Sequence, residues 1–387
     1  MVDIDFTGAN TVKGWLDRVV VAAIDNGWSD IQIRLTRDPE YVALGQAATG
    51  SAVEIRARIN RTMQPVATLK GQNADTLVNH IKATAGIGSG PAIQPLDGLY
   101  PFKETVEDGE LARAVDIRVA VFPTYAGETL ALRLPAADVA VTMDDLNLNA
   151  HNRQLVDRAI GMANGLVLVA GPVGSGKSTT LRTFVRALGG PDVTVWTVED
   201  PVEMRIEDVD QISINAEAGN GWPEVLTGLR RSDLEVLMIG EIRNFEQASA
   251  ALEIGNSGAK VLASIHANDS IGAVMQLMAL ADAKPRTLGA QLRAVISQRL
   301  LRRLCTDCAG AGCGTCGDSG YRGLCPIHEV LLLNDDFAAA LAAGANLAEL
   351  HAVAAGNGMF TLRHCAQELV ESGVTDLREV RRVLGVD

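Results

Sequence analysis

The segment from Gly171 to Thr179, GPVGSGKST, constrains the fold of this chain more than any other. It matches the pattern of a phosphate-binding P-loop, it follows the apolar run GLVLVA, and it precedes a segment in which a helix is expected to begin at Lys177. Average residue frequencies produce the full pattern by accident in on the order of one per cent of chains this long. The segment therefore predicts an α/β fold in which the loop joins a buried strand to a helix and binds a nucleotide.

The residues of this loop have separate expected tasks. Its glycines turn successive backbone N–H groups toward phosphate oxygens, which the helix N-terminus also attracts. Lys177 is expected to reach the β- and γ-phosphates, the Ser178 hydroxyl to bind Mg²⁺, and Thr179 to assist. The expected substrate and cofactor are therefore ATP and Mg²⁺, bound by the loop residues Gly171, Pro172, Val173, Gly174, Ser175, Gly176, Lys177, Ser178 and Thr179.

Three later apolar runs end in polar residues that a parallel sheet brings to one edge. VTVWTVE ends at Glu199, LEVLMIGE at Glu241 and KVLASIH at His266. Glu199 is expected to face Mg²⁺ or a water, and Glu241, which follows Gly240 where many P-loop proteins have an aspartate, to polarise the attacking water. His266 is a candidate sensor of the γ-phosphate. The alternatives are that these acids are helix caps and that the histidine is structural.

Four of the six cysteines lie in one short segment, CTDCAGAGCGTC. Cys305, Cys308, Cys313 and Cys316 have the C-x2-C-x4-C-x2-C spacing with which four thiolates surround one tetrahedral Zn²⁺. Four sulfurs close the coordination shell, so the expected zinc site staples a loop and does not catalyse. Disulfides or an iron–sulfur cluster are the alternatives.

Hydrophobic periodicity divides the chain into several parts. A helix over Thr11–Asn26, four short alternating strands and a helix near Ala74–Ala85 predict a small α+β domain over residues 1–135. The expected parts that follow are a linker at 136–149, a parallel α/β core at 150–300, the cysteine segment at 301–330 and a helical part at 331–387.

Charge and hydropathy limit the partners and the location. The formal net charge of −13 disfavours nucleic acid, so no nucleic-acid partner is expected. Acidic residues near the N-terminus and apolar runs too short to span a bilayer predict a cytoplasmic protein. One basic cluster is expected on a helix before the cysteines, pairing with acids of this chain or a neighbouring subunit, or contacting acidic lipid: Arg293, Arg299, Arg302 and Arg303.

Read together, GPVGSGKSTT, VEDPVE, RRSDLEVLMIGEIRN, ASIHANDS, SQRLLRRLC and GYRG resemble, in this order, the secretion ATPases of type II secretion and type IV pilus assembly. The similarity extends back through MDDLNL to SDIQIRL, VEIRARIN, QPLDG and GETLALRLP. It implies a RecA-like P-loop core with a parallel-containing sheet, preceded by a small α+β (PAS-like) domain. It further implies a homohexamer that hydrolyses ATP between its two domains, an inner-membrane platform protein as partner, and a position on the inner face of the plasma membrane.

The resemblance also assigns a task to the N-terminal domain, which supplies positive charge at the γ-phosphate in this family. Arg56, Arg58, Arg118 and Arg133 lie at positions that resemble the family's arginine-bearing strands. The alternative is that alternating arginines solvate one face of an exposed sheet. Leu99 stands where an arginine is common, and RRSDLE where relatives often have RQDPD, so one inter-domain contact is in doubt.

The resemblance covers several machines, and the cysteines favour one of them. Assembly ATPases carry the tetracysteine, whereas retraction ATPases usually do not, so a motor for pilus or pseudopilus assembly is predicted. A retraction or conjugative-transfer ATPase of the same fold is the alternative, followed by a nucleic-acid translocase and a nucleotide-gated switch. No counterpart of the extra N-terminal domain with which many relatives dock a membrane partner is expected in this sequence, so docking is expected to differ.

Overall fold

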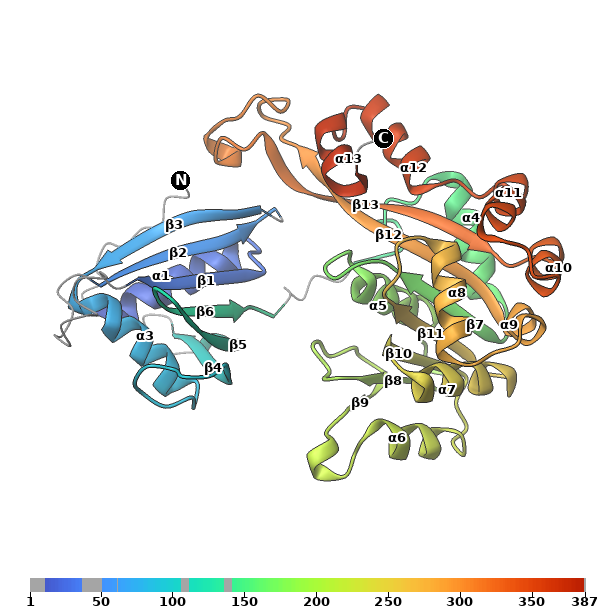
Figure 1. Ribbon diagram of the computed structural model, residues 1–387, viewed down its shortest axis with the longest axis horizontal. Coiled ribbons are helices and arrows are strands. Elements are labelled where there is room, and N and C mark those ends of the chain that lie inside the picture. Colours follow the sequence, from blue (N-terminus) through green and yellow to red (C-terminus); the bar gives the residue numbers. More distant parts are fainter. Residues whose placement is uncertain (1–10, 37–50, 61, 106–110, 136–140, 386–387) are drawn as a thin grey trace. The chain divides into compact units, whose positions relative to one another are not determined.

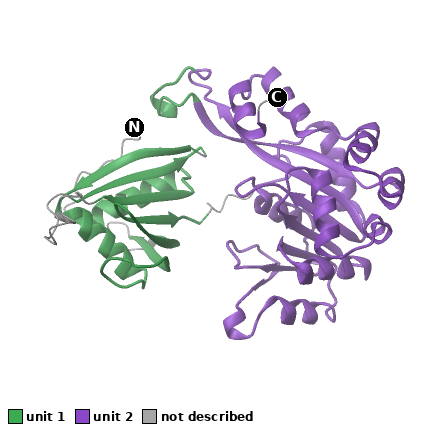
Figure 2. Cartoon of the chain, viewed as in Figure 1, with its two compact units in different colours: residues 1–138, 311–320 green, residues 139–310, 321–387 purple. Residues whose placement is uncertain are grey.

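The computed structural model describes residues 11–36, 51–60, 62–105, 111–135 and 141–385. The chain divides into two compact units, one of residues 1–138 with 311–320 and one of residues 139–310 with 321–387 (Figure 2). Expectations for residues 1–10 and for linker positions 136–140 lie outside the described residues. Within the described residues, none of the helices is both long and apolar enough to cross a membrane.

In its described residues, the N-terminal unit contains an antiparallel six-stranded sheet and the helices α1 and α3 (Figure 1). Apolar residues of both helices and of the strands form one core, which confirms the predicted α+β character. The helix expected over Thr11–Asn26 is present, with the Thr11 hydroxyl accepting a hydrogen bond from Gly14 N at 3.0 Å. The sheet order is β3-β2-β1-β6-β5-β4, and the elements are α1 (Val12–Asp25), β1 (Asp30–Thr36), β2 (Ala52–Ile59), β3 (Thr62–Lys70), α3 (Gln72–Thr84), β4 (Leu96–Thr105), β5 (Leu111–Thr124) and β6 (Gly127–Arg133).

Two strands of this sheet, β3 and β4, were not expected from the sequence. β3 contains Pro65, and β4 contains Gly98 and Pro101, residues that are depleted in strands. Both strands lie at the edges of the sheet, where a residue without an N–H is tolerated. The sequence pattern therefore identified only the inner strands.

The larger unit is built on a seven-stranded sheet with the order β13-β12-β7-β11-β10-β8-β9. All neighbouring pairs are parallel except β12 and β13, which confirms the expected α/β core with a parallel-containing sheet. The strands are β7 (Gly165–Ala170), β8 (Val195–Glu199), β9 (Asp210–Ser213), β10 (Val236–Ile242), β11 (Lys260–Ile265), β12 (Leu292–Leu304) and β13 (Tyr321–Leu332).

Helices cover both faces of this sheet. Apolar residues of β7 and β11 alternate between two cores, one shared with α7 and α8 and the other with α4 and α5. The C-terminal segment is helical, as expected. The helices are α4 (Ala150–Gly161), α5 (Lys177–Leu188), α6 (Trp222–Leu229), α7 (Phe245–Asn256), α8 (Ser270–Leu280), α9 (Pro285–Gln291), α10 (Asp335–Ala342), α11 (Leu347–Gly356), α12 (Leu362–Glu371) and α13 (Leu377–Leu384).

The prediction of a helix at the basic cluster was wrong, because residues 292–304 form strand β12. This strand pairs with β7 on one side and β13 on the other, so most of its residues are buried and it shows no simple alternation. A buried run that contains arginines at irregular spacing resembles an amphipathic helix as much as a strand. Pairing with β7 and β13 is what makes this segment a strand and not a helix.

Three arginines of this cluster contact other parts of the chain. Arg302 Nε donates to Glu379 Oε2 at 2.8 Å, and the Glu379 side chain is fully buried. Arg299 donates to the Asn268 carbonyl at 2.7 Å, and Arg293 Nε to the Asn164 carbonyl at 3.0 Å. Pairing with an acid of this chain, one of the expected alternatives, is therefore confirmed for Arg302, whereas Arg293 and Arg299 donate to backbone carbonyls.

Candidate functional site

The P-loop connects β7 to α5 as the sequence pattern requires. Gly176 immediately precedes α5 and has a left-handed backbone with φ of 91°. A Cβ atom at this position would lie only 2.7 Å from Gln298 Nε2, so a side chain would be strained by the backbone and would displace the Gln298 amide. The loop therefore places the N-terminus of α5, with its unpaired N–H groups, at the carboxyl edge of the sheet.

Lys177 is buried and turned back into the loop. Its ammonium group donates to the Gly171 carbonyl at 2.9 Å and to the Pro172 carbonyl at 3.2 Å. Burial lowers the pKa of Lys177, the nearby Glu241 carboxylate partly offsets this, and the Arg299 charge lowers it further. The loop thus holds a positive charge at the place where P-loop proteins bind phosphate.

Glu241 and His266 lie beside this lysine. His266 Nδ1 is 3.3 Å from Lys177 Nζ, and His266 Nε2 is in contact with Glu241 Oε1. His266 Nδ1 also lies 3.2 Å from the Gly171 carbonyl, so it can accept from the ammonium group as one tautomer or donate to this carbonyl as the other. The sequence placed these three residues at ends of different elements, and the fold brings them into one line of contacts.

Glu199 and Ser178 line a cavity of about 360 Å³ next to Glu241. Burial raises the pKa of Glu199, while hydrogen bonds from Thr197 and Gln211 counteract that effect. The full lining is Ser178, Arg182, Glu199, Asp200, Pro201, Glu203, Trp222, Gly240, Glu241, Arg243, Asn244 and Gln247. A hydroxyl and several carboxylates are the oxygen ligands that Mg²⁺ prefers, so these residues fit that ion.

Gly240 lies beside Glu199 at this cavity. An added Cβ at Gly240 would lie 3.6 Å from Glu199 Cγ, so the two residues of adjacent strands β10 and β8 pack side by side. The sequence lacks an aspartate at this position. Glu199 fills the neighbouring space with a carboxylate from the next strand.

The four arginines expected at the γ-phosphate belong to the N-terminal unit. Arg56, Arg58, Arg118 and Arg133 alternate with buried residues of β2, β5 and β6, so they face away from the core. Arg58 and Arg133 both pair with Asp30, at 3.0 and 3.3 Å. Their contact with nucleotide stays a prediction.

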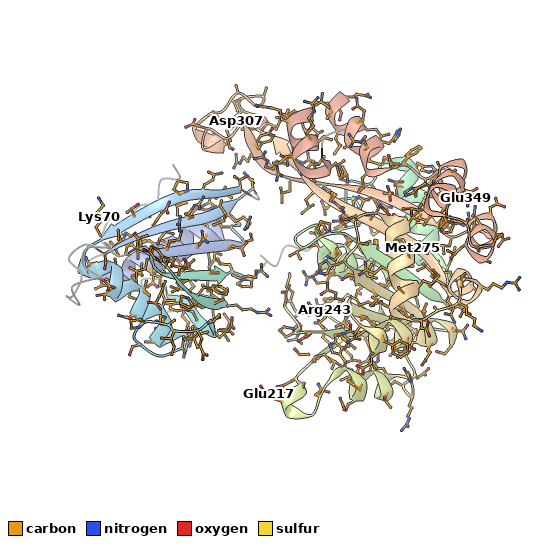
Figure 3. The ribbon with its side chains drawn as sticks, viewed as in Figure 1. Lys70, Glu217, Arg243, Met275, Asp307 and Glu349 are labelled. Carbon is orange, nitrogen blue, oxygen red and sulfur yellow. The ribbon has the colours of Figure 1, made fainter. Side chains whose placement is uncertain are left out.

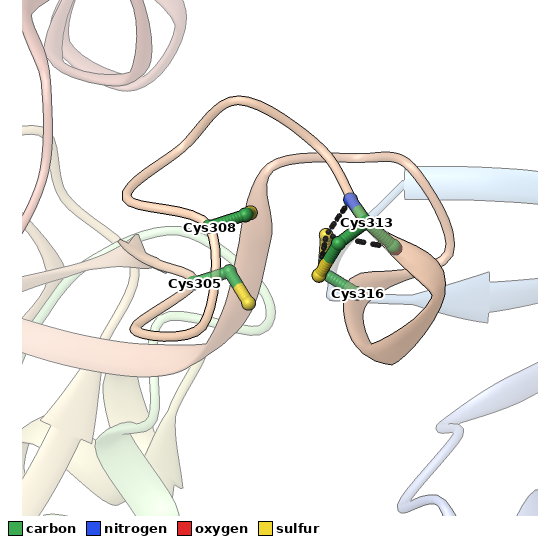
Figure 4. Close-up of side chains that lie close together, drawn as sticks. All are labelled: Cys305, Cys308, Cys313 and Cys316. Atoms are coloured by element: carbon green, nitrogen blue, oxygen red, sulfur yellow. Dashed lines mark hydrogen bonds between the residues drawn. The ribbon is translucent and has the colours of Figure 1, made fainter.

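The four cysteines of the tetracysteine loop lie close together (Figure 4). This loop, residues 305–320, joins β12 to β13, and Asp307, labelled in Figure 3, belongs to it. The four sulfur atoms all lie within 4.8 Å of one another, and the Sγ atoms of Cys313 and Cys316 are 3.8 Å apart. A tetrahedral ion with metal–sulfur bonds of about 2.3 Å requires about 3.8 Å between its sulfur ligands. The thiols therefore fit zinc.

Gln298 is a residue of this site that the sequence reasoning missed. Its Nε2 donates to the Ser175 carbonyl at 2.8 Å, and its Oε1 accepts from Thr180 Oγ1 at 2.6 Å. The side chain is 2% exposed and fastens both the P-loop and the first turn of α5 to β12. The sequence signal was only a glutamine within the SQRLLRRLC motif.

Replacing Gln298 with leucine is expected to weaken ATP binding about tenfold, because the loop carbonyl and the Thr180 hydroxyl lose their buried partner. The dissociation constant of a fluorescent ATP analogue measures the effect. Gln154→Leu, on the exposed side of α4, is the control for the chemical change. Unchanged affinity in Gln298→Leu with an unchanged melting temperature would mean that β12 does not position the loop.

The fold and the site together define a RecA-like P-loop NTPase. The model of the family "Type II/IV secretion system protein" matches residues 8–382. The chain belongs to this family, whose curated members include ATPases of type II secretion and type IV pilus assembly.

The proteins with similar sequences are longer than the part of them that this chain matches. The type IV pilus assembly ATPase PilB of Thermus thermophilus is 31% identical over 85% of this chain, which spans only 39% of that protein. The type II secretion system protein E of Klebsiella pneumoniae is 34% identical over 86% of this chain and 70% of its own length.

Solved structures share the fold at lower identity. The ATPase DotB of Legionella pneumophila superposes with a TM-score of 0.70 at 19% identity, covering 95% of this chain and 94% of DotB. The pilus retraction motor PilT, solved with bound ADP, gives a TM-score of 0.62 at 20% identity, covering 95% of this chain and 96% of PilT. At these identities the likeness concerns the fold alone.

Proposed function

We propose that this chain hydrolyses ATP and that the reaction powers assembly of a type IV pilus or a type II secretion pseudopilus. The contacts Lys177–His266–Glu241 carry the proposal. They join the phosphate-binding lysine to Glu241, which lines the cavity, and hydrolysis needs such a carboxylate close to the phosphate site. A protein that only binds nucleotide has no need of this carboxylate.

Three residues of the candidate site have separate tasks in the proposed reaction. Lys177 leaves the loop carbonyls and pairs with β- and γ-phosphate oxygens. Glu241 accepts a proton from water as the water oxygen bonds to the γ-phosphorus and the bond from that phosphorus to the bridging oxygen breaks. His266 holds Glu241 through Nε2 and senses the γ-phosphate through Nδ1. The products are ADP and orthophosphate.

Mg²⁺ would be held by Ser178, with the carboxylates of Glu199 and Glu203 lining the same cavity. When bound, it neutralises charge on the phosphates as the γ-phosphoryl group leaves. Glu199 would orient a water at this side of the cavity through Oε2, since Oε1 accepts from Thr197 at 2.9 Å and from Gln211 at 3.2 Å.

The motor itself is proposed to be a homohexamer in the cytoplasm, on the inner face of the plasma membrane. Arg56, Arg58, Arg118 and Arg133 would supply positive charge from the N-terminal unit, and hydrolysis would move that unit against the ATPase unit. An inner-membrane platform protein would receive the motion. The family and its named relatives support this proposal at the level of secretion and pilus ATPases.

Assembly is favoured over retraction by the tetracysteine loop and by the relatives in sequence. The relatives named above are a pilus assembly ATPase and a type II secretion protein. The likeness to the retraction motor PilT is one of fold. Acidic lipid stays a possible contact of the basic residues near the loop, of which Arg303 is one.

The test is phosphate release from ATP and Mg²⁺ across a size-exclusion profile of the full chain. Turnover is expected in the fraction with six times the 40.9 kDa mass of the chain. A monomer that binds ATP without turnover would contradict the proposal in favour of a nucleotide-gated switch. Hydrolysis that DNA stimulates and salt abolishes would favour a translocase.

A further inference from the structure

Arg182 is a buried charge in the candidate site that no P-loop pattern contains. It lies on α5, one helical turn beyond Ser178, and its side chain is 5% exposed. Side chains four apart on a helix are neighbours and lean toward the helix N-terminus, so the guanidinium lies on the Ser178 side. It lines the same cavity as Ser178, Glu199 and Glu241.

The Arg182 guanidinium has no hydrogen bond and no ion pair within the described part of the chain. The side chain is only 5% exposed, so an opposite charge nearby stabilises its guanidinium. Glu199 supplies it: this carboxylate is 6% exposed, and the Arg182 charge acts on it directly. Both hydrogen bonds to Glu199 are made at Oε1, which leaves Oε2 for another donor.

The other charged groups around Glu199 do not fill this role. Glu203, in the loop after β8, raises the pKa of Glu199 by repulsion. Arg243 follows the active-site end of β10, where Figure 3 labels it, and its Nε is 2.5 Å from Glu241 Oε2. Arg182 therefore remains as the buried cation that faces Glu199.

We propose that Arg182 is a positioning residue for Glu199: its buried guanidinium offsets the clustered carboxylates and orients Glu199 Oε2 toward the metal side of the cavity. The inference rests on the proposed ATPase function, in which Glu199 acts on a water. It predicts that the effect of Arg182 passes through Glu199 and disappears when Glu199 can no longer carry a charge.

The test is a double-mutant cycle with Arg182→Met and Glu199→Gln, measured by kcat and KM for ATP and by the thermal unfolding midpoint. Arg182→Met is expected to lower kcat about tenfold, with KM changed less than about twofold, and to have almost no effect in the Glu199→Gln background. Arg182→Lys is expected to recover most of the rate, because it keeps the charge. Arg186→Met, one turn further along α5 and outside the cavity lining, is the matched control.

Two outcomes would overturn the inference. Equal losses from Arg182→Met in both backgrounds would mean that Arg182 acts on the substrate or on folding independently of Glu199, and full activity of Arg182→Met would mean that it does not act at all. If the wild-type protein lacks turnover, the proposed function fails. The double-mutant cycle measured by thermal unfolding midpoints still tests whether Arg182 and Glu199 are coupled in that case, because it needs no hydrolysis.

Discussion

Replacing Glu241 with glutamine is expected to lower kcat for ATP hydrolysis by about 10²- to 10⁴-fold, the range that removal of a general base produces. Glutamine keeps the size of the side chain but cannot accept a proton from water. The Glu241 side chain is 17% exposed and in contact with His266, so the replacement fits the same space. Binding of ATP should change little, because Lys177 and the P-loop backbone make the phosphate contacts.

The measurement is single-turnover phosphate release with the dissociation constant for ATP determined in parallel. Glu246→Gln, an exposed acid in the first turn of α7 outside the cavity lining, is the matched control and should keep the wild-type rate. A Glu241→Gln variant that retains a third or more of the rate would show that another group activates the water. Glu199 would then be the first candidate.

The sequence predicted the ATPase core well because its strands follow local rules. Buried parallel strands are continuous apolar runs, and each of the three runs identified after the P-loop ended in a polar residue that the fold brings to the site. Ala170 of β7 pairs with Ile265 of β11, so the P-loop and His266 begin from adjacent strand ends. The position of Glu241 beside them follows from the pairing of β10 with β11.

The parts that could not be predicted depend on contacts between distant segments. Gln298 and Thr180 are 118 positions apart, and no periodicity indicates that they form a hydrogen bond. Arg182 reads as an ordinary polar residue of an amphipathic helix, since its burial depends on strands β8 and β10. The error at residues 292–304 has the same origin, because two neighbouring strands determine that this segment is extended.

The tetracysteine loop is the second place where the sequence pattern and the geometry agree. Leu304 of β12 pairs with Tyr321 of β13, so the strand pair holds the two ends of the loop together. Inside the loop, the backbone N–H groups of Cys313 and Gly320 donate to Cys316 Sγ at 3.2 and 3.3 Å. Such donors stabilise a thiolate, the form of cysteine that binds metal.

The remaining cysteines offer a contrast within the same chain. Cys325 and Cys365 are buried away from the loop, and burial raises the pKa of Cys325 and raises that of Cys365 to about 12. Cys365 Sγ donates to the His328 carbonyl at 3.1 Å. These two residues are therefore neutral thiols at physiological pH and poor metal ligands.

Replacing Cys308 with serine is expected to reduce bound zinc from about one ion per chain to less than about a tenth, because the closed shell loses one of its four thiolates. The same loss should open residues 305–320 to proteolysis, since the apparent free energy of zinc binding in comparable sites is about 10–16 kcal/mol and is coupled to folding. Elemental analysis by mass spectrometry and limited proteolysis measure the two effects. Cys325→Ser is the matched control and should keep its zinc. The zinc assignment would be contradicted by wild-type protein that contains no zinc and whose mass is lower by the four hydrogens that two disulfides remove. An unchanged zinc content in Cys308→Ser would mean that other residues are the ligands.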